Sequence, residues 1–263
     1  KGFEACGWVL VAAAHIRMAV PLTFLYKVWI FISIGIVNAF VRLFTRVEVH
    51  GRENIPFGGG VLLAANHCSA LDVLLVPVTY MTRWPLTPFE LVMAPAKERF
   101  LNIPIIGTII HTWGAFPVQH GGRDVSSMRR ILELMKTEKM MLFPEGTRSP
   151  DGQLQPGMRS AGWLIHQARP LVIPTVLFGT GKVWPKGRIL PRLFGRVKVV
   201  FGKPLNLDKY YDQPRSGVVA QQVVDEVMAT IAHLKTVHRP EWDTGPSIRS
   251  TPTPSTTSIS SRR

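Results

Sequence analysis

From Val47 onward the chain alternates short β-rich runs with stretches of helical spacing, and this alternation limits the folds open to it. Six apolar runs are predicted strands: Val47 to His50, Val61 to Ala65, Leu91 to Ala94, Met140 to Phe143, Leu171 to Leu177 and Val197 to Phe201. Three predicted helices cover Val125 to Lys136, Arg159 to Gln167 and about Gly217 to His233. Alternation of this kind is typical of a parallel sheet between helices. We therefore expect an α/β fold with a largely parallel sheet covered by helices.

The residues before this pattern form a strongly apolar segment from Trp8 to Phe44. Within it, Val28 to Val41 carries no charge, but a simple span needs roughly 20 residues. A longer apolar stretch reaches that length only by including Lys27, whose charge would have to reach the interface. Three arrangements stay open: two helices in one leaflet, separated at Pro21, a single span, or a buried helix pair in a soluble protein.

These patterns divide the chain into three parts. Residues 1–46 are predicted to be an apolar helical segment that associates with a membrane, and residues 47–237 to be the α/β domain. Residues 238–263 are rich in Ser, Thr, Pro and Arg, and they hold too little apolar surface to bury. We expect this last part to be a disordered basic tail.

The chain is strongly basic, with a formal net charge of +14. Such proteins attract polyanions, which are nucleic acids or anionic lipid surfaces. The sequence shows no zinc-finger spacing, helix-turn-helix signature or aromatic RNA-binding motif, so we expect no nucleic-acid partner. Arg42, Arg46 and Arg52 lie at or just after the end of the apolar segment and could meet anionic headgroups. The 2 cysteines imply no disulfide framework, and no cluster of metal ligands is apparent.

A first polar motif, Asn66-His67-Cys68-Ser69-Ala70-Leu71-Asp72, follows a predicted strand. On a continuous helix His67 and Asp72 would lie about 140° apart, so they meet only if His67 precedes the helix and Asp72 begins it. A carboxylate on one ring nitrogen sets the tautomer and stabilises the imidazolium. The pair suits general-base activation of a hydroxyl, although His67 could also simply pack a turn. Covalent catalysis is not favoured, because the nucleophile-elbow spacing is absent.

A second motif, Phe143-Pro144-Glu145-Gly146-Thr147-Arg148-Ser149, follows another predicted strand. Arg148 offers a planar donor fork that suits a phosphate, and Gly146 lets the backbone approach a ligand closely. Thr147 adds a hydroxyl donor. Glu145 would repel an anion unless it pairs with a cation or orients Arg148. The same residues also suit an ordinary exit from a strand into a turn, so this motif alone leaves both interpretations open.

In this order and spacing, the two motifs resemble the glycerolipid acyltransferase family, which includes the 1-acylglycerol-3-phosphate acyltransferases. The family's Asn-His-x-Ser-x-x-Asp block is matched from Asn66 to Asp72, and its Phe-Pro-Glu-Gly-Thr-Arg-Ser block from Phe143 to Ser149. The apolar run Val172 to Val176 resembles a further block, and the likeness covers roughly residues 48 to 205. One block departs from the family pattern, because His120 stands where an arginine is common and Arg123 follows three residues later.

The resemblance implies the fold, the reaction and the site. His67 would be the general base and Asp72 its orienting carboxylate. The acceptor hydroxyl would attack the thioester of acyl-CoA or acyl-carrier protein directly, without a cofactor. The acceptor would be 1-acylglycerol-3-phosphate, giving phosphatidic acid, and the enzyme would be associated with membrane lipids at the cytoplasmic face of the cell membrane. The implied acceptor-binding residues are Glu145, Gly146, Thr147 and Arg148, with Lys97 and Arg123 as further phosphate contacts.

Two alternatives remain beside this prediction. The altered block at His120 leaves room for another lipid or glycolipid acceptor. A non-catalytic, basic membrane-binding protein of the same fold is the second alternative, and the intact His67–Asp72 pair argues against it. The basic and apolar region from Lys182 to Lys203 could be a lip that enters headgroups, a patch that grips CoA or an acidic carrier protein, or a solvated loop.

Overall fold

The computed structural model describes residues 24–82, 90–118, 125–185, 187–188, 190–192 and 194–243, with only the backbone of Arg99 and Phe100. Three predictions therefore lie outside the described residues. They are the helix break at Pro21, the phosphate contact of Arg123 in the block with His120, and most of the disordered tail predicted at residues 238–263, of which only 238–243 are described. The division into three domains also stays a prediction.

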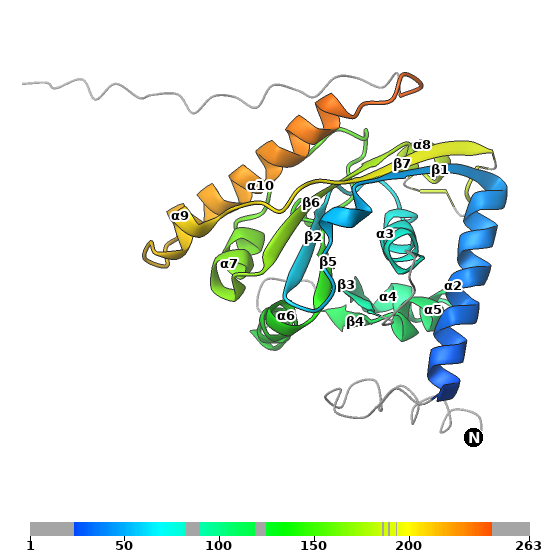
Figure 1. The fold of residues 1–263 in the computed structure, drawn as a ribbon, viewed down its shortest axis with the longest axis horizontal. Coiled ribbons are helices and arrows are strands. Elements are labelled where there is room, and N and C mark those ends of the chain that lie inside the picture. The colour runs from blue at the N-terminus through cyan, green and yellow to red at the C-terminus, as the bar shows by residue number, and fades with distance from the viewer. Residues whose placement is uncertain are drawn as a thin grey trace, which may run out of the picture.

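A seven-stranded sheet forms the centre of the described part (Figure 1). Its strands, in the spatial order β1-β7-β6-β2-β5-β3-β4, are β1 (Thr45–His50), β2 (Val61–Ala65), β3 (Val92–Lys97), β4 (Ala115–Val118), β5 (Lys139–Leu142), β6 (Leu171–Phe178) and β7 (Gly195–Phe201). The five strands from β6 to β4 are parallel. Strand β7 runs antiparallel to β6, and β1 pairs in parallel with β7. The prediction of a largely parallel α/β sheet is confirmed.

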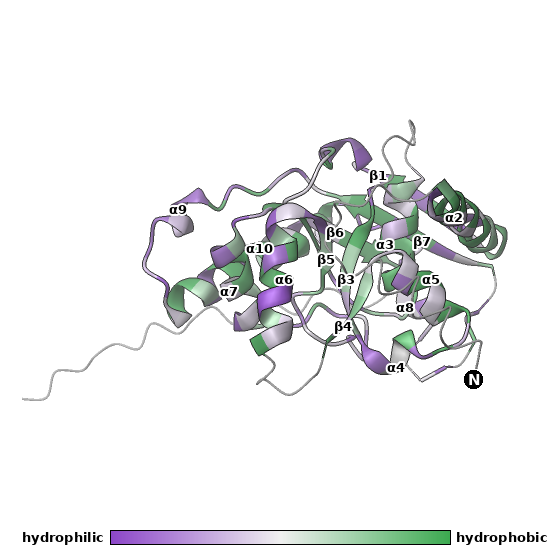
Figure 2. Ribbon diagram, turned by 90° about the horizontal axis from the view of Figure 1, so that it is seen from below, coloured by the Kyte–Doolittle hydropathy of each residue, from purple (hydrophilic) through white to green (hydrophobic). Residues whose placement is uncertain are grey.

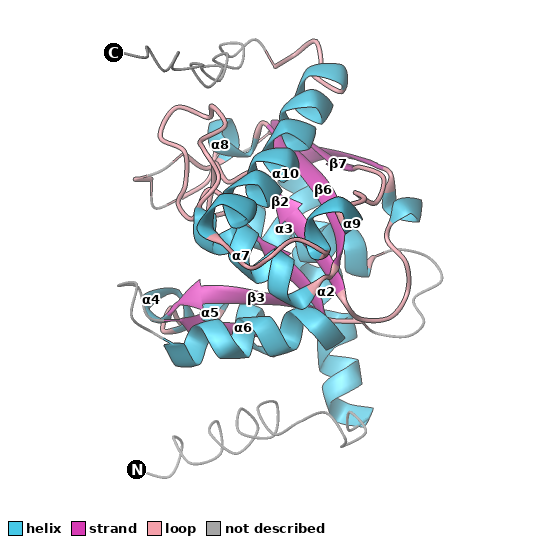
Figure 3. Cartoon of the chain, turned by 90° about the vertical axis from the view of Figure 1, so that its left-hand side faces the viewer, coloured by secondary structure: helices cyan, strands magenta, loops and turns pink. Residues whose placement is uncertain are grey.

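Helices cover both faces of this sheet (Figures 1 and 3). One layer holds α6 (Val125–Thr137), α7 (Arg159–Ala168) and α10 (Gly217–Val237), and the other face is covered by α2 (Phe24–Phe44) and α3 (Asp72–Met81). The remaining helical elements are short: η1 (Arg52–Asn54), α4 (Glu98–Leu101), α5 (Ile106–Thr112), α8 (Thr180–Val183) and α9 (Asp208–Tyr211). The helices predicted at 125–136, 159–167 and 217–233 are all present.

The central strand β2 shows why the sheet needs both layers. All five of its residues are buried. Leu62 and Ala64 belong to the apolar cluster that includes side chains of α6, α7 and α10. Val61, Leu63 and Ala65 belong to the cluster that includes side chains of α3. Successive side chains of a strand point to opposite faces, so a strand buried on both faces is apolar throughout, as parallel strands usually are.

A close approach of α7 and α10 sets the position of the α10 carboxyl end. A Cβ atom on Gly162 would clash with the backbone oxygen of Ala220, so only glycine allows the two helices to come this near. Ser216 caps the amino end of α10, where its Oγ accepts a hydrogen bond from Val219 N at 3.2 Å. Packing on α7 therefore holds α10 across the sheet, and its last turn reaches the edge where the parallel strands end.

Helix α2 is apolar on both faces (Figure 2), but the rest of the domain covers only one of them. Its covered stripe holds Ile30, Ser33, Ile34 and Val41. Ser33 accepts a hydrogen bond from Trp113 Nε1 at 3.0 Å, which ties the helix to the end of α5. The opposite stripe exposes Phe24, Leu25, Phe31, Ile32, Ile36, Phe40 and Leu43. Among the described helices, α2 is the one whose length and composition would allow it to cross a membrane.

Candidate active site

The sheet brings both sequence motifs to one edge. Because β2, β3, β5 and β6 are parallel, their carboxyl ends meet there. His67 follows β2, the Glu145–Arg148 segment follows β5, and Lys97 is the last residue of β3. The carboxyl edge of an open α/β sheet is the usual place for a ligand. Segments about 70 residues apart in the chain thus become neighbours.

His67 and Asp72 form the pair that the spacing predicts. His67 lies in the loop after β2, Asp72 is the first residue of α3, and His67 Nδ1 is 2.9 Å from Asp72 Oδ2. An ionised carboxylate can only accept, so Nδ1 carries the hydrogen and Nε2 is left to take a proton. The side chain of Asp72 is fully buried, whereas that of His67 is 14% exposed. The imidazole can therefore meet a substrate while its partner cannot.

Backbone donors hold the Asp72 carboxylate in place. Besides the imidazole, Asp72 Oδ2 accepts hydrogen bonds from Cys68 N and Ser69 N, each at 2.7 Å. The His67 ring also stacks on Phe143, with ring centroids 3.9 Å apart and planes 10° apart. This stacking joins the first motif to the second. The orientation of the imidazole is thus set on one side by Asp72 and on the other by an aromatic ring.

Two polar residues of the first motif, Asn66 and Ser69, have structural roles that sequence reasoning left unassigned. Asn66 is buried and pairs with the backbone of Leu177 on β6, accepting from its N at 2.8 Å and donating to its O at 3.1 Å. Ser69 Oγ donates to Trp184 O at 2.7 Å. These bonds tie the His67 loop to the end of β6 and to the segment after α8.

Glu145 is buried and supports the loop of the base. Its Oε1 accepts a hydrogen bond from His67 N at 2.8 Å, and its Oε2 accepts one from Gln155 N at 2.9 Å. Burial raises the pKa of this carboxyl group to about 7, against the two backbone donors, which lower it. The expectation that Glu145 contacts a substrate stays a prediction. Sequence reasoning missed its positioning of the His67 backbone, for which no local pattern gives a signal.

The rest of the second motif faces outward. Gly146 has φ +69, and a Cβ atom there would clash with Met158 Sδ, so the turn requires glycine. Gly146 and Thr147 are exposed, and Arg148 is partly exposed. Within the described ranges no acidic side chain forms an ion pair with Arg148. Lys97 is partly exposed at the end of β3. These cationic groups are therefore available to an anion.

Cys68 is a poor nucleophile in this site. Its pKa is raised to about 12, first by burial and then by the negative charge of Asp72. A thiol with so high a pKa is protonated near neutral pH, and the thiolate is the reactive form. The expectation that no covalent intermediate forms is consistent with this environment.

No group of three possible metal ligands occurs in the part of the chain that the structure describes.

Comparison with known proteins gives the same assignment as the motifs. A model of the acyltransferase family matches residues 46–178, about half of the chain. A chloroplastic 1-acyl-sn-glycerol-3-phosphate acyltransferase of Brassica napus is 30% identical over 186 residues, which are 69% of this chain and 49% of that protein. A 1-acyl-sn-glycerol-3-phosphate acyltransferase of Bacillus subtilis is 27% identical over 161 residues, 61% of this chain and 74% of that protein.

The fold also has a match among solved structures. The 1-acyl-sn-glycerophosphate acyltransferase PlsC of Thermotoga maritima superposes with a TM-score of 0.61 at 24% identity, over 87% of this chain and 88% of that one. With the family model, the motifs and this fold in agreement, the chain belongs to the glycerolipid acyltransferase family of the PlsC type. It spans about half the length of the plant relatives that it matches.

The buried Glu145 predicts a pH-dependent stability. Its pKa is raised in the folded state from 4.5 to about 7, so its contribution to stability is present at low pH and is lost as the pH rises through this window. We expect the free energy of unfolding of wild type to fall relative to that of Glu145→Gln, by roughly 3 kcal/mol, across this window. Urea denaturation at a series of pH values measures this difference.

Glu133→Gln is the matched control, because Glu133 is exposed on α6. The glutamine at 145 also loses one backbone hydrogen bond, but that cost is the same at every pH. A difference between wild type and Glu145→Gln that stays constant from pH 4.5 to 7 would contradict the assigned shift.

Proposed function

We propose that this chain transfers a fatty acyl group from an acyl thioester to the hydroxyl of a lysophospholipid, with 1-acylglycerol-3-phosphate as the acceptor and phosphatidic acid as the product. The observation that carries the proposal is the His67–Asp72 pair at the same sheet edge as the partly exposed Arg148, which forms no ion pair within the described residues. The names of the relatives from Brassica napus and Bacillus subtilis support the same acceptor. The pair supplies a base for a hydroxyl, and Arg148 supplies a partner for a phosphate on the same molecule.

The proposed reaction needs one base and no covalent enzyme intermediate. His67 Nε2 removes the proton of the acceptor hydroxyl as its oxygen bonds to the thioester carbonyl carbon. Asp72 accepts the Nδ1 hydrogen bond and stabilises the imidazolium that forms. The tetrahedral intermediate then loses the C–S bond, and the leaving thiolate takes the proton from His67. The products are the ester and a free thiol, and the base returns to its neutral form.

In this proposal the acceptor phosphate meets Arg148 and Lys97. Arg148 follows β5 and Lys97 ends β3, and the two strands are neighbours in the sheet, which supports a shared contact. The guanidinium fork can hold two phosphate oxygens at once, which also orients the glycerol hydroxyl toward the base. Thr147 and the Gly146 backbone lie in the same exposed turn and are suited to further contacts. Another phosphorylated lipid would meet the same groups, so the acceptor panel in the test includes related lipids.

Removal of the base should abolish turnover. We expect His67→Ala to lower kcat by at least about 100-fold, because general-base catalysis contributes that much or more. Acyl transfer from radiolabelled acyl-CoA and from acyl-carrier protein to lysophosphatidic acid is measured in detergent, beside other lysolipids. His233→Ala, at an exposed position on α10, is the control and should keep its activity. Unchanged activity of a folded His67→Ala protein would exclude the mechanism.

Removal of the Arg148 guanidinium should weaken binding of the acceptor and leave binding of the acyl donor unchanged. We expect Arg148→Ala to raise the KM for lysophosphatidic acid about 10- to 100-fold, since a charge-assisted hydrogen bond is lost. The KM for the acyl donor should change little. Arg215→Ala, at an exposed position before α10, is the matched control. An increase confined to the KM for the acyl donor would mean that the two substrate sides are reversed.

We also infer that the chain binds a membrane surface, at its cytoplasmic face, through the exposed stripe of α2. The domain covers the opposite stripe from Tyr26, which donates to Thr112 O, as far as Val41. A helix that crosses a bilayer meets lipid through a core about 30 Å thick, and here protein occupies one side over most of the helix. This favours a helix lying in one leaflet.

A second apolar segment lies beside the carboxyl end of α2. Phe194 N donates a hydrogen bond to Phe44 O, and the two rings are 6.3 Å apart. The side chains of Leu190 and Phe194 are strongly exposed. Since β1 and β7 run against the central strands, this end of α2 is at the same edge of the sheet as His67. This position supports the prediction that the region from Lys182 to Lys203 contacts lipid headgroups, close enough to the site for a lipid acceptor to reach it from the membrane.

Polar substitutions on the α2 stripe should release the protein from membranes. We expect Phe40→Ser combined with Leu43→Ser to weaken binding to anionic vesicles at least about 10-fold, because two large apolar side chains no longer enter the lipid. Vesicle co-sedimentation measures the partition coefficient. The control is Val218→Ser, since Val218 is equally exposed but lies on α10. Equal binding of the double variant and wild type would show that this stripe does not contact lipid.

A further inference from the structure

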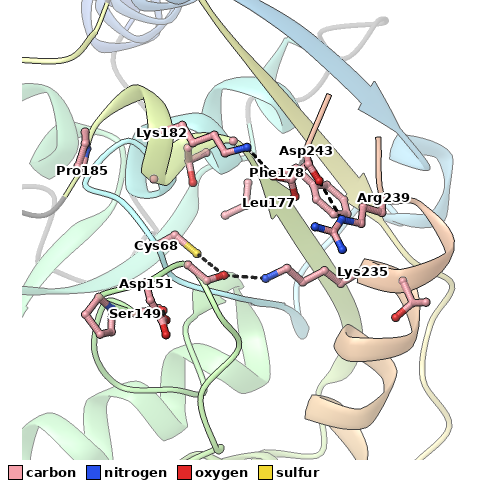
Figure 4. Close-up of a pocket in the computed structure, with 16 residues that line it drawn as sticks. Cys68, Ser149, Asp151, Leu177, Phe178, Lys182, Pro185, Lys235, Arg239 and Asp243 are labelled. Atoms are coloured by element: carbon pink, nitrogen blue, oxygen red, sulfur yellow. Dashed lines mark hydrogen bonds and ion pairs between the residues drawn. The ribbon is translucent and has the colours of Figure 1, made fainter. Parts of the chain in front are cut away.

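A pocket of about 300 Å³ lies next to the candidate active site, and none of the residues proposed to bind the acceptor lines it (Figure 4). Cys68, the residue after the base, forms part of its wall. The other walls come from residues 149–152, the end of β6 with α8, and the last turn of α10. The end of β6 puts this pocket on the β6 side of β2, and residues 149–152 of the loop after β5 reach across to it, whereas Lys97 ends β3 on the other side of β5.

Three cationic side chains converge on this pocket. Lys182 belongs to α8, Lys235 to α10, and Arg239 follows α10, and Figure 4 shows the three around one space. Lys235 Nζ donates to Gly152 O at 2.8 Å, and Arg239 Nε donates to Asp243 O at 2.9 Å.

Two acidic side chains, Asp151 and Asp243, also line the pocket. Asp243 pairs with Lys182 at 3.0 Å. Asp151 Oδ1 accepts hydrogen bonds from Ser149 Oγ and Gln153 N, each at 3.0 Å, within its own loop. The lining therefore holds three cationic and two acidic side chains, and its formal charge is positive.

A buried hydroxyl group adds a second, independent signal. Thr180 lines the pocket and is fully buried, and its Oγ1 has no hydrogen-bond partner within the described residues. A buried hydroxyl without a partner costs free energy, so such groups usually have one in the functional state. A ligand with acceptor oxygens would satisfy Thr180 and the neighbouring cations together.

We propose that this pocket binds the phosphate end of the phosphopantetheine arm of the acyl donor. The inference rests on the proposed acyl transfer and assigns the donor phosphate to the pocket at the end of β6, apart from the groups proposed for the acceptor phosphate. The arm is shared by acyl-CoA and acyl-carrier protein, and it ends in the thioester that must reach the base. A phosphate in the pocket lets the arm pass Cys68 toward His67. The acceptor hydroxyl then approaches the thioester from the Arg148 side, so the two substrates do not compete for one phosphate site.

The first test removes one cation of the pocket. Binding of CoA, 4′-phosphopantetheine, pantetheine and lysophosphatidic acid is measured by calorimetry for wild type, Arg239→Gln and the control Arg215→Gln. We expect Arg239→Gln to weaken binding of CoA and 4′-phosphopantetheine about 10-fold, because a charge-assisted contact to phosphate is lost. Pantetheine, which lacks the phosphate, and lysophosphatidic acid should bind as before. Unchanged affinity for CoA, or an equal loss for lysophosphatidic acid, would overturn the assignment.

The second test separates ligand binding from fold stability. Thr180→Val keeps the shape of the side chain and removes the unpaired hydroxyl, so the free energy of unfolding should stay equal or rise. Affinity for 4′-phosphopantetheine should nevertheless fall. A purely structural Thr180 would leave that affinity unchanged and would remove this part of the proposal.

Kinetics with each donor then identify its source. The KM for acyl-CoA and the KM for acyl-carrier protein are compared between Arg239→Gln and Arg215→Gln, and the donor whose KM rises in Arg239→Gln is the one held by the pocket. Normal KM values for both donors in an active Arg239→Gln enzyme would refute the pocket assignment and leave the proposed function intact. Loss of CoA binding in Arg239→Gln, with no acyl transfer by wild type, would instead refute the reaction and keep the site.

Discussion

The site depends on one buried carboxylate oxygen that accepts three N–H groups. Asp72 Oδ2 takes hydrogen bonds from the His67 ring and from the backbone of Cys68 and Ser69. The loop after β2 is therefore wrapped around the first residue of α3. Loss of this carboxylate would free both the loop and the imidazole, because the same atom sets the tautomer of the base and the path of the chain that carries it.

Around this centre the carboxyl edge of the parallel sheet gathers the groups that we propose for the two substrates. The cationic pocket lies at the end of β6, Arg148 follows β5, and Lys97 ends β3. The proposed reaction joins two anionic molecules, so both phosphates must be held without repelling each other. Separate cationic groups near His67 would meet this need. The exposed stripe of α2 ends at the same edge, which favours delivery of a lipid acceptor from the membrane surface.

The strands were predictable where burial on both faces makes the sequence continuously apolar, as in Val61–Ala65, which matches β2 from end to end. Strand β4 was not predicted, because its four residues include Pro117 and follow the bend at Gly114. It is defined by pairing with β3 and not by an apolar run of its own. Helices α4 and α5 were also missed, since short helices depend on contacts distant in sequence more than on local propensity.

For the site, spacing was enough to predict that His67 precedes a helix begun by Asp72, because a five-residue separation on one helix would place them on different faces. The burial of Glu145 and the pairing of Asn66 with Leu177 were beyond reach, since each depends on strands that are adjacent only in the folded sheet. The cationic pocket could not be predicted either, because Lys182, Lys235 and Cys68 are far apart in the chain. Residue types and short spacings thus specified the chemistry, whereas burial and long-range packing specified which groups it can use.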